Sequence, residues 1–172
     1  MFGLYLAVVY EEMGDLLKGA NDLQGADRAW AQAGQYAGKF SNHGLVSILI
    51  TMISSNRKRG ELAASLGRRE QALAHAEIAL HAGGEPKPGS KMVWNHVLPR
   101  RASAVGFIHA ALAKGPARTA DDTERAIEWL HKSAGLWYEA KKQAGYQPRH
   151  QKALEEVQTE LAALTTSAAK VR

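Results

Sequence analysis

The chain has 172 residues, of which 45% are hydrophobic and 23% are charged, values that fit one globular domain with an ordinary core. Its 22 basic and 17 acidic residues are mixed along most of the sequence, so the net charge of +5 indicates a solvated surface rather than a nucleic-acid-binding one. The absence of cysteine excludes disulfides, thiolate zinc sites and cysteine nucleophiles.

The apolar stretches at Phe2–Tyr10 and Leu45–Ile53 are far shorter than the roughly 20 residues that a bilayer-spanning helix needs. The first of them has no basic leader and meets Glu11 and Glu12 at once, which is not the pattern of a signal peptide. We therefore expect no membrane insertion and a cytoplasmic location. Because residue 2 already fits a helical pattern, we also expect the chain to be a piece of a longer protein.

The first predicted element is a pair of helices separated by a break at Gly19–Asp22. Large and small residues recur on one face of each helix: Tyr10, Met13, Gly14 and Leu17 on the first, and Ala26, Trp30 and Ala33 on the second. This order resembles the tetratricopeptide repeat, a helix pair of about 34 residues in which small residues at fixed places let the two helices approach closely.

The second and third elements repeat the pattern more loosely. Gly60 and Gly106 take the place of Gly14, and the three glycines are equally spaced. Their spacing exceeds the roughly 34 residues of a standard unit, so we predict longer helices. A loop at 83–89 separates the second unit from the third, and an inserted loop at Lys114–Asp122 interrupts the third.

Local signals mark the ends of the later helices. Pro99 is expected to kink the first helix of the third unit or to mark its late start, and Asp121 with Glu124 has the spacing of a capping box. After Pro148 a final helix carries an apolar stripe opposite a polar face, as a terminal cap requires: Leu154, Val157, Leu161 and Leu164.

These elements predict an all-α chain. The resemblance implies a tetratricopeptide-like α-solenoid of about three long helix pairs in residues 1–145, followed by a C-terminal capping helix in residues 146–172. The segment at 126–145 is also similar to the C-terminal repeat regions of some bacterial serine/threonine protein kinases, which implies a context in bacterial signalling.

Catalytic and metal-binding signatures are missing from the sequence. It contains no HExxH, GxSxG, GxGxxG or phosphate-binding GxxxxGK[ST] motif. No two of the seven histidines lie three or four residues apart, so no helix turn presents a metal-binding pair. We expect a protein without catalytic activity, cofactor or metal, and a helical enzyme with a histidine–carboxylate site is the alternative that stays open.

In the tetratricopeptide family the first helix of each pair lines a concave groove that binds a peptide or a partner domain. The resemblance places eight residues of this chain at such groove positions: Glu11 and Asp15 in the first unit, Ser54, Arg57 and Glu61 in the second, and Arg100, Ser103 and Phe107 in the third. Glu11 and Asp15 would repel the carboxylate that a chaperone-tail receptor of this family binds, so we expect a protein segment of mixed charge instead.

Two further alternatives stay open. A cluster of basic residues favours a nucleic-acid-binding helical repeat, although Glu61 and Glu70 interrupt it: Arg57, Lys58, Arg59, Arg68, Arg69, Arg100 and Arg101. The other is a structural or dimerisation segment of a larger signalling protein, for which a homodimer and an exposed apolar patch on the first or last helix are expected.

Overall fold

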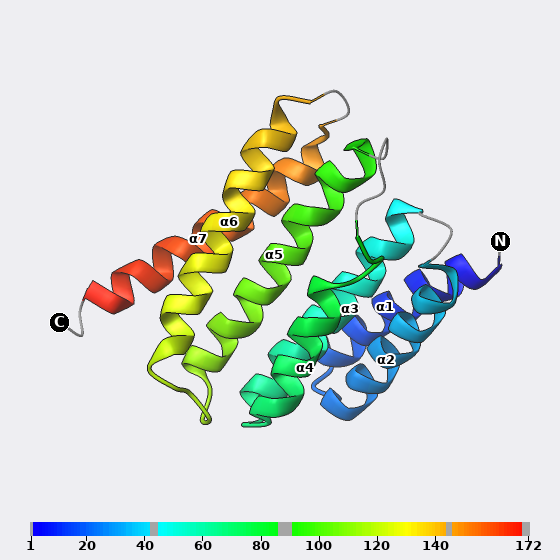
Figure 1. The fold of residues 1–172 in the computed structure, drawn as a ribbon. Helices are drawn as coiled ribbons and strands as arrows, with labels where there is room; N and C mark the ends of the chain where they lie inside the picture. The colour runs from blue at the N-terminus through cyan, green and yellow to red at the C-terminus, as the bar shows by residue number, and fades with distance from the viewer. Residues whose placement is uncertain (1, 42–44, 86–90, 144–145, 170–172) are drawn as a thin grey trace.

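The computed structural model describes residues 2–41, 45–85, 91–143 and 146–169, with the side chains of all of these except 2–4, 91–94 and 168–169. The described residues form seven α-helices and no β-strand (Figure 1), so the predicted all-α class is confirmed. The helices are α1 (Phe2–Gly19), α2 (Leu23–Phe40), α3 (Val46–Ser65), α4 (Arg69–Leu80), α5 (Lys91–Lys114), α6 (Asp121–Lys141) and α7 (Pro148–Ala169).

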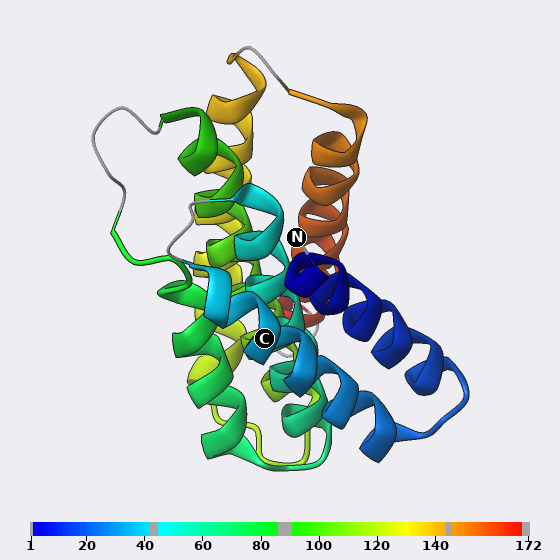
Figure 2. The same ribbon diagram turned by 90° about the vertical axis from the view of Figure 1, so that its right-hand side faces the viewer.

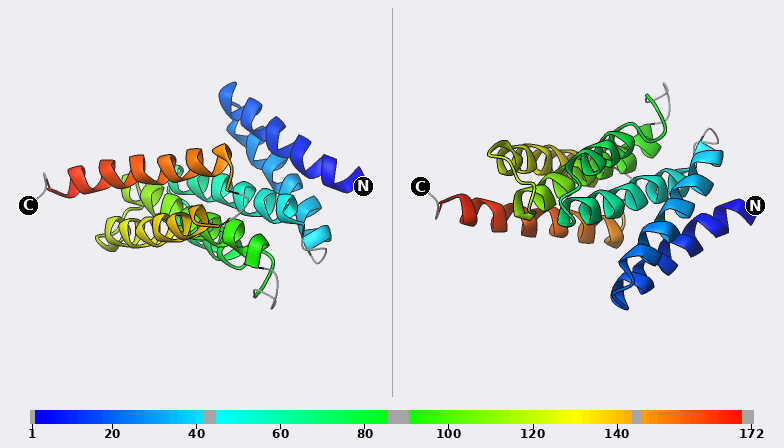
Figure 3. Two further views of the ribbon diagram at one scale, coloured as in Figure 1. Left: turned by 90° about the horizontal axis from the view of Figure 1, so that it is seen from above. Right: turned by 90° about the horizontal axis from the view of Figure 1, so that it is seen from below.

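Successive helices lie side by side in the order of the sequence. α1 packs on α2, α3 on α4 and α5 on α6, while α2, α4 and α6 each also contact the helix that follows (Figure 2). The odd-numbered helices form a second series of contacts, α1 with α3, α3 with α5 and α5 with α7. α7 lies on the side of α5 and α6 toward which α1 also lies (Figure 3). Most packing is therefore between helices that are near neighbours in the sequence.

The three equally spaced glycines each lie where a neighbouring helix approaches closely. A Cβ atom at Gly14 would lie 2.4 Å from the Trp30 indole, and one at Gly106 would lie 2.7 Å from Cγ of Leu130. At Gly60 the obstructing side chain is Ile108 of α5, at 2.5 Å. Any larger residue would push these helices apart, which gives a packing reason for the recurring glycine.

The buried apolar side chains form four clusters among the described residues rather than one central core. The cluster between α5, α6 and α7 is built on large side chains such as Leu130, Trp137, Leu154 and Val157. The second helices of the first two pairs bury mainly alanine: Ala26, Ala29, Ala33 and Ala37 of α2, and Ala72, Ala76 and Ala79 of α4. Such small side chains allow the close helix packing seen throughout.

Most helix ends fall where local signals predict them. α1 ends at Gly19, and Asp22 caps α2 by accepting a hydrogen bond of 2.8 Å from the backbone N–H of Gly25. α7 begins at Pro148, as expected. α5 continues from Lys91 through Pro99, so this proline does not mark the start of the helix.

The predicted capping box at the start of α6 is wrong by two positions. Neither Asp121 nor Glu124 caps the helix. Instead Thr119 donates from its backbone N–H (2.7 Å) and its hydroxyl (2.9 Å) to the Asp122 carboxylate. Thr119 and Asp122 thus have the same three-residue spacing, and Asp122 is the carboxylate that turns inward.

The predicted boundary between residues 145 and 146 lies outside the described residues, as do positions 86–89 of the predicted loop. None of the helices in the described part of the chain combines the length and the apolarity needed to cross a membrane.

Candidate functional site

One face of the molecule carries an ion-pair network between α1 and α3. The Lys58 ammonium lies 2.8 Å from a carboxylate oxygen of Glu11 and 2.8 Å from one of Asp15, and the Ser54 hydroxyl donates to Glu11. Because residues four apart share one side of a helix, Ser54 and Lys58 of α3 face α1 together. The structure thus brings together three of the predicted groove residues, Glu11, Asp15 and Ser54.

Asp15 is also held by α2. The indole Nε1 of buried Trp30 donates to one carboxylate oxygen of Asp15 at 3.0 Å, and Lys58 pairs with the other oxygen. The Asp15 side chain is 52% exposed, whereas the Glu11 side chain is 17% exposed. A cation from a partner can therefore reach Asp15 without displacing Trp30.

A second ion-pair network centres on Arg57 and links α3 to α7. Its guanidinium lies 2.6 Å from a carboxylate oxygen of Glu61 and 2.6 Å from one of Glu156, and it stacks over the Phe107 ring with 3.7 Å to the ring centroid. Burial lowers the pKa of Arg57, but the carboxylates of Glu61 and Glu156 outweigh this effect and raise it above the ordinary value. Arg57 is therefore a permanent charge that covers an aromatic ring.

The Arg57 network borders a hollow of about 510 Å3 between α3, α5 and α7. Lys114 of α5 and Glu160 of α7 form a further ion pair across it. Charged and apolar side chains share its lining: Arg57, Glu61, Phe107, Ala110, Ala111, Lys114, Glu156, Thr159 and Glu160. Together the two networks give one face, formed by α1, α3, α5 and α7, which we call the ion-pair face.

The predicted groove residues of the third unit are less accessible than the others. Ser103 and Phe107 are each 8% exposed, and Phe107 belongs to the apolar cluster that contains Leu154 and Val157 of α7. These two predicted groove residues therefore offer little surface to a partner. Because α7 packs along α5, a partner reaches Phe107 fully only when Arg57 or α7 moves.

Arg100 is separated from the ion-pair face by its contacts with α6. Its guanidinium stacks over the Trp137 ring, 4.8 Å from the centroid, and donates to the backbone carbonyl of His96 at 2.8 Å. Burial, with a smaller effect from the nearby Arg149, lowers the pKa of Arg100 to about 10, so it stays charged at neutral pH.

Two residues of the ion-pair face, Lys58 and Glu156, were not predicted from the sequence as groove residues. Lys58 lies one helical turn after Ser54, a spacing that places it on the same side of α3. Glu156 lies on the predicted capping helix beside its apolar stripe, and no signal within that helix shows that its carboxylate meets Arg57 of α3. Both supply the countercharges of predicted groove residues.

The histidines show no metal-binding arrangement among the residues that the structure describes. His109 lies 3.4 Å from the Asp122 carboxylate, which is already bound by Arg69. His96 and His150 stack with 4.3 Å between ring centroids, and the charges that act on both are those of Arg100 and Arg149. Neither pair gathers two histidines around a carboxylate.

Comparisons with models of protein families, with curated proteins and with solved structures found no match for the chain.

Proposed function

We propose that the chain is a non-catalytic protein-interaction module, a tetratricopeptide-like α-solenoid that binds a peptide or a partner domain on its ion-pair face. The order of helix contacts supports the solenoid, since each helix packs on the next one or the next but one. The equally spaced glycines at the close helix approaches support a repeat. A place in a larger signalling protein is part of this proposal and rests on the sequence resemblance of residues 126–145 alone.

The observation that carries this proposal is the run of partly exposed ion pairs along α1, α3, α5 and α7. Such pairs contribute little to stability, because water screens them. A partner that offers its own charges can replace them at low cost, and charge complementarity then determines which segment binds. The Phe107 ring under Arg57 is 8% exposed, so it contributes to binding only where a partner displaces Arg57.

The charges on this face favour a partner of mixed charge. Glu11 and Asp15 surround Lys58 on the side of α3 that faces α1, and Glu61 and Glu156 surround Arg57 on the side that faces α7. Each group thus offers two carboxylates and one cation, and a segment that carries charges of both signs can pair with both kinds of group.

The basic residues that suggested a nucleic-acid-binding repeat do not lie together on one surface. Arg57, Lys58, Arg59 and Arg69 pair with carboxylates of the chain. Arg101 is buried and donates to the carbonyl of Ala82 at 3.0 Å. The carboxylate partners of these cations lie on α1, α2, α6 and α7, so the cations point to different sides and are poorly placed to neutralise one run of phosphates.

Reversing the charges of the ion-pair face tests the proposal while keeping its internal contacts. In the triple variant Glu11→Lys, Asp15→Asn and Lys58→Glu, an ion pair of opposite polarity replaces the original, and the amide at position 15 still accepts from Trp30. We expect the variant to fold normally and to retain less than about a tenth of the partner captured by the wild-type chain from lysate. The measurement is quantitative mass spectrometry of the captured proteins.

The matched control swaps an exposed ion pair of α6, Glu139→Lys with Lys142→Glu, and is expected to capture as much partner as the wild type. Equal capture by all three proteins would show that the partner binds elsewhere. Recovery of nucleic acid alone would refute protein binding as the function.

A second candidate function, self-association, is favoured by the outer side of α1. Apolar side chains recur there at helical spacing and are exposed to solvent: Tyr5, Val8, Val9, Met13 and Leu16. Tyr5 is 70% exposed and Leu16 is 76% exposed. Contiguous apolar surface of this kind marks an interaction site, and α1 of a second copy is a suitable cover.

Sedimentation velocity across a range of protein concentrations distinguishes this candidate. Self-association through α1 predicts a dimer that the double variant Val9→Lys with Leu16→Glu converts to a monomer. The control variant Ile78→Lys with Tyr138→Glu changes two exposed apolar residues elsewhere and is expected to remain dimeric. A wild-type chain that stays monomeric at the highest concentration attainable would rule out this role.

A further inference from the structure

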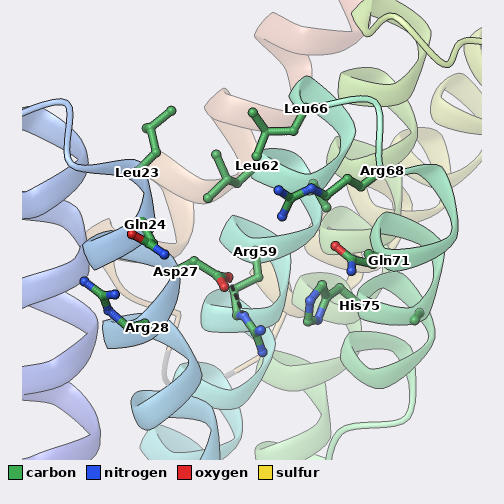
Figure 4. Close-up of a pocket in the computed structure, with 12 residues that line it drawn as sticks. Leu23, Gln24, Asp27, Arg28, Arg59, Leu62, Leu66, Arg68, Gln71 and His75 are labelled. Carbon is green, nitrogen blue, oxygen red and sulfur yellow. Dashed lines mark hydrogen bonds and ion pairs between the residues drawn. The ribbon is translucent and has the colours of Figure 1, made fainter.

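A second hollow, of about 640 Å3, lies between α2, α3 and α4 (Figure 4). α3 forms its floor, and α2 and α4 form its two walls. Arg59 and Leu62 of α3 line it together with Leu66 just after the helix, whereas Ser54 and Lys58 of α3 belong to the ion-pair face. The 3.6-residue period of the helix therefore separates the two sites on different sides of α3.

The charge of this hollow is strongly asymmetric. Three arginines line it, Arg28 from α2, Arg59 from α3 and Arg68 just before α4, while Asp27 is the one carboxylate in its lining. Arg59 pairs with Asp27 at 2.8 Å. Arg28 and Arg68 are exposed and form no ion pair within the described part of the chain. Two guanidinium groups without an ion-pair partner in the described residues thus flank the hollow: that of Arg68 points into it, whereas that of Arg28 points away from it, toward α1 (Figure 4).

Neutral polar groups complete the walls. Gln24 of α2 and Gln71 of α4 place side-chain amides at the hollow. His75 contacts the Asn56 amide oxygen through Nδ1 at 3.0 Å, and burial together with the Arg59 charge lowers its pKa below the ordinary value. His75 is therefore neutral at pH 7, and the positive charge of the hollow resides on its arginines.

The hollow also exposes apolar surface. Leu62 and Leu23 are half-buried, and Leu66 at the end of α3 is 47% exposed. A leucine-sized side chain that is buried against them leaves water and thereby favours binding. The floor is thus apolar and the walls are cationic, and the volume lies within the range of roughly 300–1,000 Å3 found for ligand pockets.

We propose that this hollow binds a short acidic segment of a partner protein that carries at least one leucine-like side chain. One carboxylate of the segment pairs with Arg68, and a second pairs with Arg28 once this exposed side chain turns toward the hollow, in the bidentate geometry that guanidinium groups favour. The apolar side chain lies on Leu62 and Leu66. This site is additional to the ion-pair face and has a different preference, for acidic rather than mixed charge.

The same observations disfavour a nucleic acid at this site. No tryptophan, tyrosine or phenylalanine is found in the lining on which a base could stack, and two free arginines neutralise few phosphates. The leucines have no role in binding a phosphate backbone, whereas they contribute directly to binding an amphipathic peptide.

Fluorescence polarisation with a labelled peptide of glutamate and leucine tests this proposal on the 172-residue chain. We expect the double variant Arg28→Glu with Arg68→Glu to bind this peptide at least about tenfold more weakly than the wild type. The variant Leu66→Ser is expected to bind about threefold more weakly. The control variant Arg125→Glu with Lys152→Glu makes the same change of net charge at two exposed residues and is expected to bind as the wild type does.

Further binding measurements either support or refute the proposal. The triple charge reversal of the ion-pair face should leave this binding unchanged, so the two sites succeed or fail separately. Equal affinity for a leucine-free glutamate peptide, with full displacement by inorganic phosphate, would reveal a simple anion site and overturn the proposal. Binding that the Arg28→Glu and Arg68→Glu changes do not weaken would overturn it as well, and so would dimerisation of the chain through this hollow.

Discussion

Replacing Asp122 with alanine is expected to lower the free energy of unfolding by about 3 kcal/mol. The Asp122 side chain is fully buried, and Arg69 donates to its two oxygens at 2.6 and 3.0 Å. Thr119 donates twice more, and His109 lies 3.4 Å away. One carboxylate therefore connects the start of α4, the middle of α5 and the start of α6.

The physical reason for this large effect is the charge of Asp122. Burial alone would raise its pKa, but the hydrogen bonds from Arg69 and Thr119 outweigh burial and hold the pKa well below the ordinary value. The group is thus ionised at any working pH. Its removal leaves the Arg69 guanidinium and the Thr119 N–H without their acceptor, and unmatched polar groups of this kind are costly.

The neighbouring carboxylate provides the control for this experiment. Asp121 is exposed in the first turn of α6, where a negative charge interacts favourably with the helix dipole. We expect Asp121→Ala to cost no more than about 0.5 kcal/mol in urea unfolding followed by circular dichroism. Equal losses for the two variants would show that the Asp122 contacts contribute no more than an ordinary surface charge.

The sequence predicts the helix pairs well because their signals are local. The break at Gly19–Asp22 and the start at Pro148 follow from the conformational preferences of glycine, aspartate and proline. The glycine spacing also has a direct cause, since Trp30 and Leu130 leave no room for a Cβ atom. The capping residue of α6 was misplaced because several acidic residues adjoin there, and only packing selects the one that turns inward.

Part of the candidate site can also be predicted from the sequence, because that part depends on the local periodicity of one helix. Ser54, Arg57 and Glu61 share one side of α3, so helical periodicity alone places them together. Which acidic side chain pairs with which basic side chain depends on the distance between their helices. Glu156 lies 99 positions after Arg57 in the sequence, and no pattern within either helix encodes their contact. The hollow of Arg28 and Arg68 likewise exists only because α2 and α4 stand apart over α3.

Lowering the pH from 7 to 4.5 is expected to destabilise the fold, chiefly through His150 at the start of α7. His150 is 1% exposed and stacks on His96 and on Trp137, with 4.3 and 5.6 Å between ring centroids. Its Nδ1 accepts a hydrogen bond of 2.9 Å from the backbone N–H of Gln147. Only the neutral ring with an unprotonated Nδ1 makes this bond.

The sign of the effect follows from the direction of the pKa shift. Burial, assisted by the charges of His96, Arg100 and Arg149, lowers the pKa of His150 to about 4 in the folded chain. An unfolded histidine takes up a proton near pH 6.5, so below that pH protonation favours the unfolded chain. The stability contributed by neutral His150 is fully present above pH 6.5, and up to about 3 kcal/mol is lost as the pH falls toward 4.

Three other histidines also destabilise the folded chain when the pH is lowered. Burial lowers the pKa values of His75, His96 and His109 below the ordinary value, so each of them also favours unfolding in acid. The variant His150→Asn separates the contributions, because its side-chain oxygen can still accept from Gln147 but does not titrate. We expect it to be less stable than the wild type at pH 7 and to lose markedly less stability between pH 7 and 4.5.

Urea unfolding of the wild type, His150→Asn and the exposed-site control His131→Asn at both pH values measures these differences. The control is expected to show the same loss as the wild type. A wild-type free energy of unfolding that does not change between pH 7 and 4.5 would mean that His150 carries its proton in the folded chain. The Gln147 N–H would then face another N–H, and α7 could not begin with the hydrogen bond that the structure shows.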